Sequence, residues 1–135
     1  MLLIERIVGK WFRNKNLLGV KEFYNSNSVS VSDELEKNFP KIRREYDSPH
    51  QTYISNDDKW RLFFLKGAGI WFKRNCLSMP ITHSILKRHS NVVSAYISVL
   101  GPRKKLNLHA GPYSGVLRLH LALDIPHQQR CCLSV

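Results

Sequence analysis

Regular alternation over residues 116–123, with leucine at every second position, constrains the fold more than any other feature of this sequence. The stretch reads Val-Leu-Arg-Leu-His-Leu-Ala-Leu, so its four leucines share one face, and Arg118 and His120 share the other. A period of two residues is typical of a β-strand whose faces meet different surroundings. Because burying a charged group without partners costs too much free energy, the second face must meet water or a polar cavity.

A second alternating stretch, residues 93–99, places Ser98 on a hydroxyl-bearing face opposite an apolar one. An aromatic and apolar run over residues 60–65 precedes it, and Gly-Pro pairs at 101–102 and 111–112 follow it. Strands joined by such turns predict an antiparallel sheet within a sandwich or barrel.

Apolar residues at helical spacing predict two helical segments before and between these strands. The first begins at Ser32 and carries one apolar stripe, which Pro40 either kinks or restarts as a new helix. The second covers residues 80–88. Residues 1–12 fit a short basic amphipathic helix. We therefore expect a poorly assigned N-terminal segment over 1–31 and one domain over 32–135.

The composition, with 43% hydrophobic residues in a chain of 135, predicts one folded domain. No apolar run approaches the ~20 residues that span a bilayer, and the apolar start is too short for a secretory signal, so we expect a cytoplasmic protein. The cysteines Cys76, Cys131 and Cys132 lack CxxC spacing, which predicts reduced, buried thiols rather than a zinc site.

The chain is strongly basic, with 21 Lys and Arg against ten Asp and Glu and a net charge of +11. Such an excess attracts polyanions, including nucleic acid and anionic membrane surfaces. The basic residues lie in short dispersed groups and no aromatic-interleaved patch accompanies them. This pattern predicts a solvated surface without a specific nucleic-acid site, and it leaves peripheral contact with an anionic membrane open.

Two further polar residues, Asn107 and His109, precede a turn-rich connection that leads to Arg118 and His120. If the two flanking segments pair as strands, one imidazole lies near a second imidazole and a guanidinium. The pattern alone leaves two interpretations open, a polar pocket on a β-scaffold or a set of surface residues.

Residues 109–121, which read His-Ala-Gly-Pro-Tyr-Ser-Gly-Val-Leu-Arg-Leu-His-Leu, resemble the signature of the aspartyl/asparaginyl β-hydroxylase family. Supporting matches lie upstream in the expected order, and the resemblance covers residues 33–135; the upstream matches are at 35–36, 42–45, 60–65, 75–76, 80–82 and 94–100. The resemblance implies a mainly β fold, a double-stranded β-helix (jelly roll, cupin-like) with N-terminal helices, incomplete at its C-terminal end.

The same resemblance implies an Fe(II)- and 2-oxoglutarate-dependent dioxygenase that uses O2 to hydroxylate a peptidyl Asp/Asn or a lipid acyl chain. His109 resembles the first iron ligand, a neutral imidazole suited to ferrous iron. Arg118 and His120 resemble the pair that holds the 2-oxoglutarate carboxylate near the metal, and Ser98 resembles the hydroxyl that helps to bind the distal carboxylate. Gly111 stands where most such oxygenases carry a carboxylate ligand.

The sequence departs from the family pattern after His109, because no later residue matches the family's second iron-binding His or second cosubstrate Arg. His127 lies in a turn-like segment and is interpreted as a loop residue. Residues 131–135 resemble a core strand at which the chain stops, and an unpaired strand edge there favours self-association. We therefore expect low activity from this chain alone. The alternatives are a catalytically inactive truncated remnant and a basic binding module for nucleic acid or anionic lipid.

Overall fold

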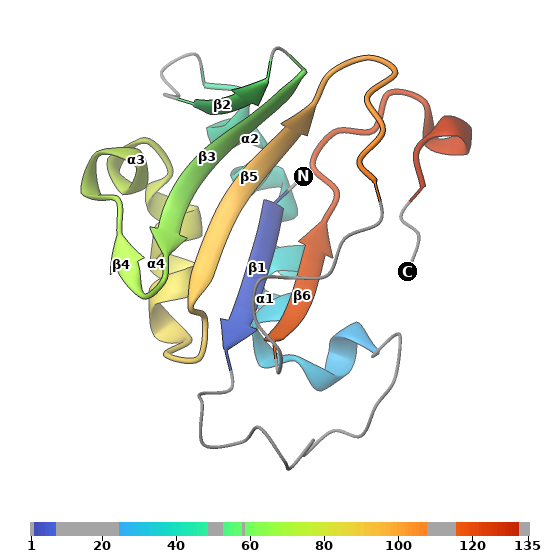
Figure 1. Cartoon of the computed structure of the whole chain (residues 1–135). Coiled ribbons are helices and arrows are strands. Elements are labelled where there is room, and N and C mark those ends of the chain that lie inside the picture. The colour runs from blue at the N-terminus through green and yellow to red at the C-terminus, as the bar shows by residue number, and fades with distance from the viewer. Residues whose placement is uncertain (1, 8–24, 49–52, 58, 108–115, 133–135) are drawn as a thin grey trace.

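The computed structural model describes residues 2–7, 25–48, 53–57, 59–107 and 116–132. Its strands form one six-stranded sheet in which every pairing is antiparallel. The strand order is β2-β3-β5-β1-β6, and β4 pairs with the end of β3 (Figure 1). The strands are β1 (Leu2–Ile7), β2 (Ile54–Asp57), β3 (Trp60–Gly67), β4 (Ile70–Trp71), β5 (Ser94–Leu100) and β6 (Val116–Leu121).

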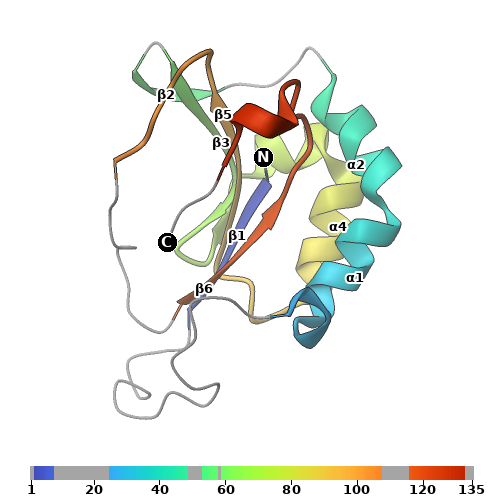
Figure 2. The ribbon, with the colours of Figure 1, turned by 90° about the vertical axis from the view of Figure 1, so that its right-hand side faces the viewer.

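Helices pack against one face of this sheet. Seen along the sheet, α1, α2 and α4 all lie on the same side (Figure 2). Helix α3 directly follows β4 at the outer edge of the sheet (Figure 1). The helices are α1 (Ser30–Lys37), α2 (Phe39–Tyr46), α3 (Lys73–Ser78) and α4 (Pro80–Arg88), with single 3₁₀ turns η2 (Ser26–Ser28) and η3 (Gln128–Arg130).

The hydrophobic core lies between the helices and the sheet. The apolar stripe predicted from residue 32 onward supplies Leu35 and Ile42, which are almost completely buried, and β3 supplies Phe63 and Leu65. Other core members come from α4, β5 and the segments around them: Met79, Ile85, Leu86, Val92, Ala95 and Ile97. The alternating strands thus turn their apolar side towards the helices, as a sheet with two different faces requires.

Pro40 stands in the first turn of α2, so the helical stripe is restarted there rather than continued through a kink. A proline is tolerated at this position because the first amides of a helix have no acceptor within it. The predicted helix over residues 80–88 is confirmed with the same bounds as α4. No helix in the described part of the chain is long and apolar enough to cross a membrane.

The N-terminus of α4 is capped by a side chain from α2. The Glu45 carboxylate accepts hydrogen bonds from the backbone amides of Ile81 and Thr82 and from the Thr82 hydroxyl, the last two at 3.0 and 2.6 Å. Carboxylates are stabilised at helix N-termini because the unpaired amides and the helix dipole both favour negative charge. Glu45 therefore joins the two helices that cover the middle of the sheet.

The antiparallel sheet and its accompanying helices agree with the predicted fold, whereas a jelly roll needs a second sheet facing the first. The described residues form one sheet, and the apolar face that a second sheet could have covered is covered by α1, α2 and α4. Alternation along a strand shows that one face is buried but not what buries it. The mainly β part of the prediction was therefore too strong for the described chain.

The predicted helix over residues 1–12 is wrong for residues 2–7, which form β1 between β5 and β6. Residues 2–7 form backbone hydrogen bonds with a strand on each side, and these bonds stabilise the strand more than local propensity would stabilise a helix. Cys76 is buried as predicted, but Cys131 and Cys132 are exposed and lie in irregular backbone, so both the buried-thiol and the core-strand predictions fail there. Residues 133–135 lie outside the described chain. His127 lies in a turn, as predicted.

Candidate functional site

Ser98, Arg118 and His120 lie on the same face of the sheet. In the strand register, His120 stands opposite Leu3 of β1, and Leu3 stands opposite Tyr96 of β5. Directly opposed residues point to the same face, and so do residues two apart on one strand. Ser98 therefore shares a face with Tyr96, and Arg118 with His120.

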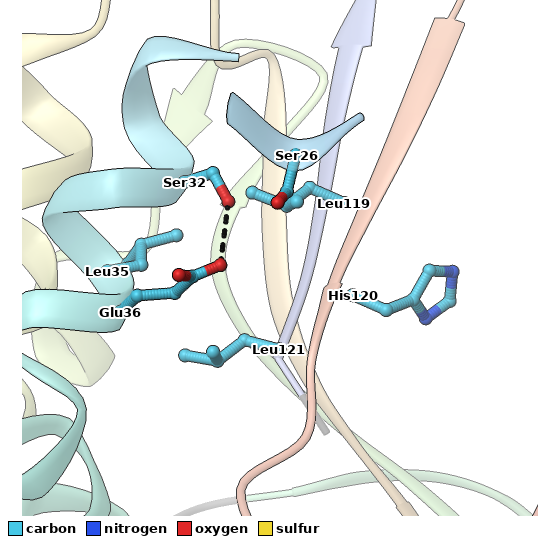
Figure 3. Close-up of a pocket in the computed structure, with 7 residues that line it drawn as sticks. All are labelled: Ser26, Ser32, Leu35, Glu36, Leu119, His120 and Leu121. Carbon is cyan, nitrogen blue, oxygen red and sulfur yellow. Dashed lines mark hydrogen bonds between the residues drawn. The ribbon is translucent and has the colours of Figure 1, made fainter. Parts of the chain in front are cut away.

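The close-up of β6 shows the same alternation in the side chains. Leu119 and Leu121 point towards α1, whereas the ring of His120 lies on the opposite side of the strand (Figure 3). Because α1, α2 and α4 cover the leucine side, the His120 side is the face without these helices (Figure 2). We call it the open face.

Ser98 is held by an aromatic residue of the neighbouring strand. The Trp60 indole N–H donates to Ser98 Oγ at 3.0 Å, and Ser98 itself is only 5% exposed. Trp60 therefore fixes the position of a buried hydroxyl group on the open face.

The environment of His120 favours a neutral imidazole. Burial is the main cause that lowers the pKa of His120, and the positive charge of Arg118 lowers it further. Arg118 is exposed, whereas His120 is half-buried. A guanidinium, a neutral imidazole and a hydroxyl all supply hydrogen-bond donors, which is the chemistry that binds carboxylates.

An aromatic row lies beside these polar groups on the open face. The Phe64 ring packs against Tyr96 with centroids 5.1 Å apart and against Phe72 at 5.7 Å. Leu62, which stands opposite Ser98, is 9% exposed. The open face therefore combines hydrogen-bond donors with a row of partly exposed aromatic rings.

The sequence shows residues 60–65 only as an aromatic and apolar run and does not predict the contact between Trp60 and Ser98. The run over residues 60–65 is apolar at almost every position, so it shows no period from which faces could be assigned. The only usable signal is the register that sets Leu62 opposite Ser98, and a single sequence does not give it.

The predicted metal ligand His109 lies outside the described residues, as does Gly111. Asn107, which was expected to share a strand with His109, lies in irregular backbone and is exposed. Within the described ranges, no group of three or more His, Cys, Asp or Glu side chains is arranged to hold a metal ion. The described residues therefore place the predicted carboxylate-binding residues on one face of the sheet, and they contain no such cluster of metal ligands.

A small pocket lies between α1 and β6, on the side of the strand away from the open face (Figure 3). It is bordered by one internal hydrogen bond, from Ser32 Oγ to Glu36 Oε1 at 3.3 Å. His120 borders this pocket, but its ring lies on the other side of β6, on the open face.

Comparison with known proteins defines the class to which this sheet and its polar face belong. The chain is a member of the aspartyl/asparaginyl β-hydroxylase family, whose family model matches residues 25–135. The resemblance inferred from residues 109–121 is thereby confirmed, and the family is one of hydroxylases.

Two curated relatives carry the comparison further. The chain is 33% identical to the ornithine lipid ester-linked acyl 2-hydroxylase of Rhizobium tropici, over 86% of this chain and 48% of that protein. It is 29% identical to the human aspartate beta-hydroxylase domain-containing protein 2, over 69% of this chain and 30% of that protein. The chain thus spans about half or less of these relatives. No solved structure matches it.

Proposed function

We propose that this chain carries part of an Fe(II)- and 2-oxoglutarate-dependent dioxygenase that hydroxylates the acyl chain of a lipid. The observation that supports the proposal is the placement of Ser98, Arg118 and His120 on one sheet face, beside an aromatic row. Donors that suit a dicarboxylate and an apolar surface that suits a hydrocarbon substrate thus lie next to each other.

The described residues would bind 2-oxoglutarate through its carboxylates. The Arg118 guanidinium offers two parallel N–H donors to one carboxylate, and a neutral His120 offers one more. The Ser98 hydroxyl, held by the Trp60 indole, would donate to the distal carboxylate. Burial of Ser98 strengthens this contact because water competes less for the hydroxyl group.

The iron in this proposal rests on family membership and on His109 rather than on the described residues. When bound, ferrous iron in such enzymes supplies the oxidising chemistry that cleaves a C–H bond with O2 and 2-oxoglutarate. The described residues contribute no cluster of metal ligands, so their part is to bind and orient the cosubstrate.

A lipid substrate is favoured over a peptidyl Asp or Asn by two observations. The relative with 33% identity is named for an ornithine lipid acyl chain. The surface beside the donors, formed by Phe64, Tyr96 and Phe72, is aromatic, which suits a hydrocarbon chain better than a polar peptide side chain.

The test is succinate formation from 2-oxoglutarate with added Fe(II), ascorbate and either an acyl lipid or an Asp-containing peptide. We expect lipid-dependent turnover that is low for this chain alone, that His109→Ala abolishes and that Arg118→Ala weakens through the KM for 2-oxoglutarate. The control Arg130→Ala removes another exposed guanidinium, in η3, and should leave the KM unchanged.

Three results would contradict the proposal in different parts. Hydroxylation of the peptide instead of the lipid would overturn the substrate class. Binding of 2-oxoglutarate, measured by calorimetry in the presence of Fe(II), that is unaffected by Arg118→Ala would overturn the assigned roles. Complete absence of 2-oxoglutarate binding would favour the inactive remnant.

A further inference from the structure

The corner formed by β4 and α3 exposes large apolar side chains around two basic residues. Ile70 is 71% exposed, Phe72 is 40% exposed and Leu77 is 80% exposed. Lys73 and Arg74, between them in sequence, are exposed as well. We call residues 70–77 the β4–α3 corner. Single exposed apolar side chains are common on soluble proteins, but several large ones close together are typical of an interaction surface.

The turn before this corner is fixed to the body of the sheet. Ala68 and Gly69 have positive φ angles of 47° and 87°, which reverse the chain between β3 and β4. The Gly69 amide donates to the Val93 carbonyl at 2.9 Å, and the Ala68 amide donates to Ser94 Oγ at 3.2 Å. Ile70 therefore follows a turn that two hydrogen bonds hold against the segment before β5 and the start of β5.

Helix α3 is fastened to β3 by its inward residues. Asn75 Nδ2 donates to the Phe64 carbonyl at 2.7 Å, and Cys76 Sγ contacts the Leu65 carbonyl at 3.4 Å. With Asn75 and Cys76 turned towards the sheet, the neighbouring positions Arg74 and Leu77 are the exposed ones. The exposed side chains of the corner thus stand on a backbone that is already ordered.

The positive charge of the protein is concentrated in the part of the chain that contains this corner. Residues 59–123 hold eleven of the 21 Lys and Arg residues and none of the ten Asp and Glu residues, and the rest of the chain is balanced. Among the described residues, the ion pairs of the acidic groups go to Arg43, Arg88 and His89. Lys73 and Arg74 therefore project uncompensated positive charge.

We propose that the β4–α3 corner docks onto an anionic lipid bilayer. Ile70 and Leu77 enter the interfacial region, and Lys73 and Arg74 bind the phosphates of the headgroups. Aliphatic side chains gain free energy from leaving water in this way, and basic residues are attracted to the negative surface potential. Nucleic acid would use the two cations but leave both aliphatic side chains in water.

This docking surface is independent of the proposed chemistry, since it needs neither iron nor 2-oxoglutarate. The two nevertheless lie on one continuous surface. Phe72 at the corner packs against Phe64, and Phe64 packs against Tyr96 on the open face. Tyr96 stands opposite Leu3 of β1, which stands opposite His120 of β6. A protein docked by its corner would thus present the apolar row of the open face near the bilayer.

The test is co-sedimentation of the chain with vesicles of phosphatidylcholine and phosphatidylglycerol at three to one, compared with vesicles of phosphatidylcholine alone. We expect binding to the anionic vesicles only. Since each basic residue at the surface contributes roughly fivefold, the double variant Lys73→Gln/Arg74→Gln should weaken binding by about 25-fold. The matched control Lys37→Gln/Lys41→Gln removes the same charge from exposed positions of α1 and α2 and should weaken it far less.

The apolar part of the surface is tested by Ile70→Ser/Leu77→Ser. Both residues are exposed, so the melting temperature should stay unchanged while vesicle binding falls. Equal losses from the two charge variants would overturn the proposal, because they would show attraction by net charge alone. Unchanged binding by the serine variant, or tighter binding to duplex DNA than to vesicles through Lys73 and Arg74, would overturn it as well.

Discussion

Replacing Glu45 tests whether the contact between α2 and α4 stabilises the fold. Its carboxylate accepts three hydrogen bonds at the start of α4, two from backbone amides and one from the Thr82 hydroxyl. Met79, at the capping position of α4, makes no side-chain capping bond of its own. The helix thus depends on a residue 37 positions away in the chain for its N-terminal cap.

The magnitude follows from what Glu45→Ala leaves behind. Thr82 is completely buried, so its hydroxyl loses an acceptor that water cannot replace, whereas the amide of Ile81 lies near the surface, where water can reach it. A lost hydrogen bond to a charged group costs about 1.5–3 kcal/mol, and a lost cap costs about 0.5–2 kcal/mol. Because these terms overlap, we expect a loss of about 2–3 kcal/mol in the free energy of unfolding.

Urea unfolding followed by circular dichroism measures this loss, and thermal unfolding checks it. An unfolding entropy of about 2.1 cal/mol/K per residue over 135 residues converts the expected loss into a melting temperature lower by roughly 7–11 °C. Thr82→Val removes only the hydroxyl group and should cost about 1 kcal/mol. In the double variant the two losses should be less than additive, because both remove the same bond.

Glu36→Ala is the matched control, since Glu36 lies on α1, is exposed and accepts one long hydrogen bond from Ser32. Its effect should stay within about 0.5 kcal/mol. If Glu45→Ala were no more destabilising than this control, the reasoning would be refuted. Strictly additive losses for Glu45→Ala and Thr82→Val would likewise show that the two residues are not coupled.

Three further predictions concern the open face and the sheet edge. Trp60→Phe removes the donor that fixes Ser98 and should raise the KM for 2-oxoglutarate several-fold. An unchanged KM in the succinate assay would show that Trp60 does not contribute to 2-oxoglutarate binding. Because folding lowers the pKa of His120 below 6.5, the unfolded chain takes up more protons as the pH falls, so this histidine costs stability only below about pH 6.5. Urea unfolding of His120→Gln at pH 7.5 and 5.5 should therefore show a smaller acid loss than the parent chain. Within the described sheet β6 pairs only with β1, so its other edge should promote self-association, and a monodisperse monomer in analytical ultracentrifugation would contradict this.

The sequence predicted those parts of the fold that depend on local periodicity. Alternation placed Arg118 and His120 on the face opposite the leucines, and the structure has them there. The bounds of α4 and the restart at Pro40 also follow from local rules. Each of these features depends on a few neighbouring residues and needs no knowledge of long-range pairing.

Features that depend on register or on distant partners were not predictable. Lys66 is buried, although lysine rarely is. The strand register shifts between Phe64 and Lys66, and this irregularity changes the face to which the Lys66 side chain points. The Lys66 amino group donates to the Val92 carbonyl at 2.7 Å. The contact between Glu45 and α4 joins two helices whose relative placement no periodicity encodes. The exposure of Cys131 was likewise missed, because an apolar composition does not ensure that a partner surface is present.

The position of β1 has a consequence for the order in which the chain folds. Strand β6 joins the described sheet only through β1, and Leu2 pairs with Leu121, so two segments more than 100 residues apart have to meet before β6 is in place. Contacts between such distant segments form late, because closing the long intervening loop costs entropy before it gives any gain. During synthesis, β1 and β5 can pair while the β6 side of β1 stays open to chaperones or to neighbouring chains. Arg118 and His120 therefore reach their places only when β6 pairs with β1.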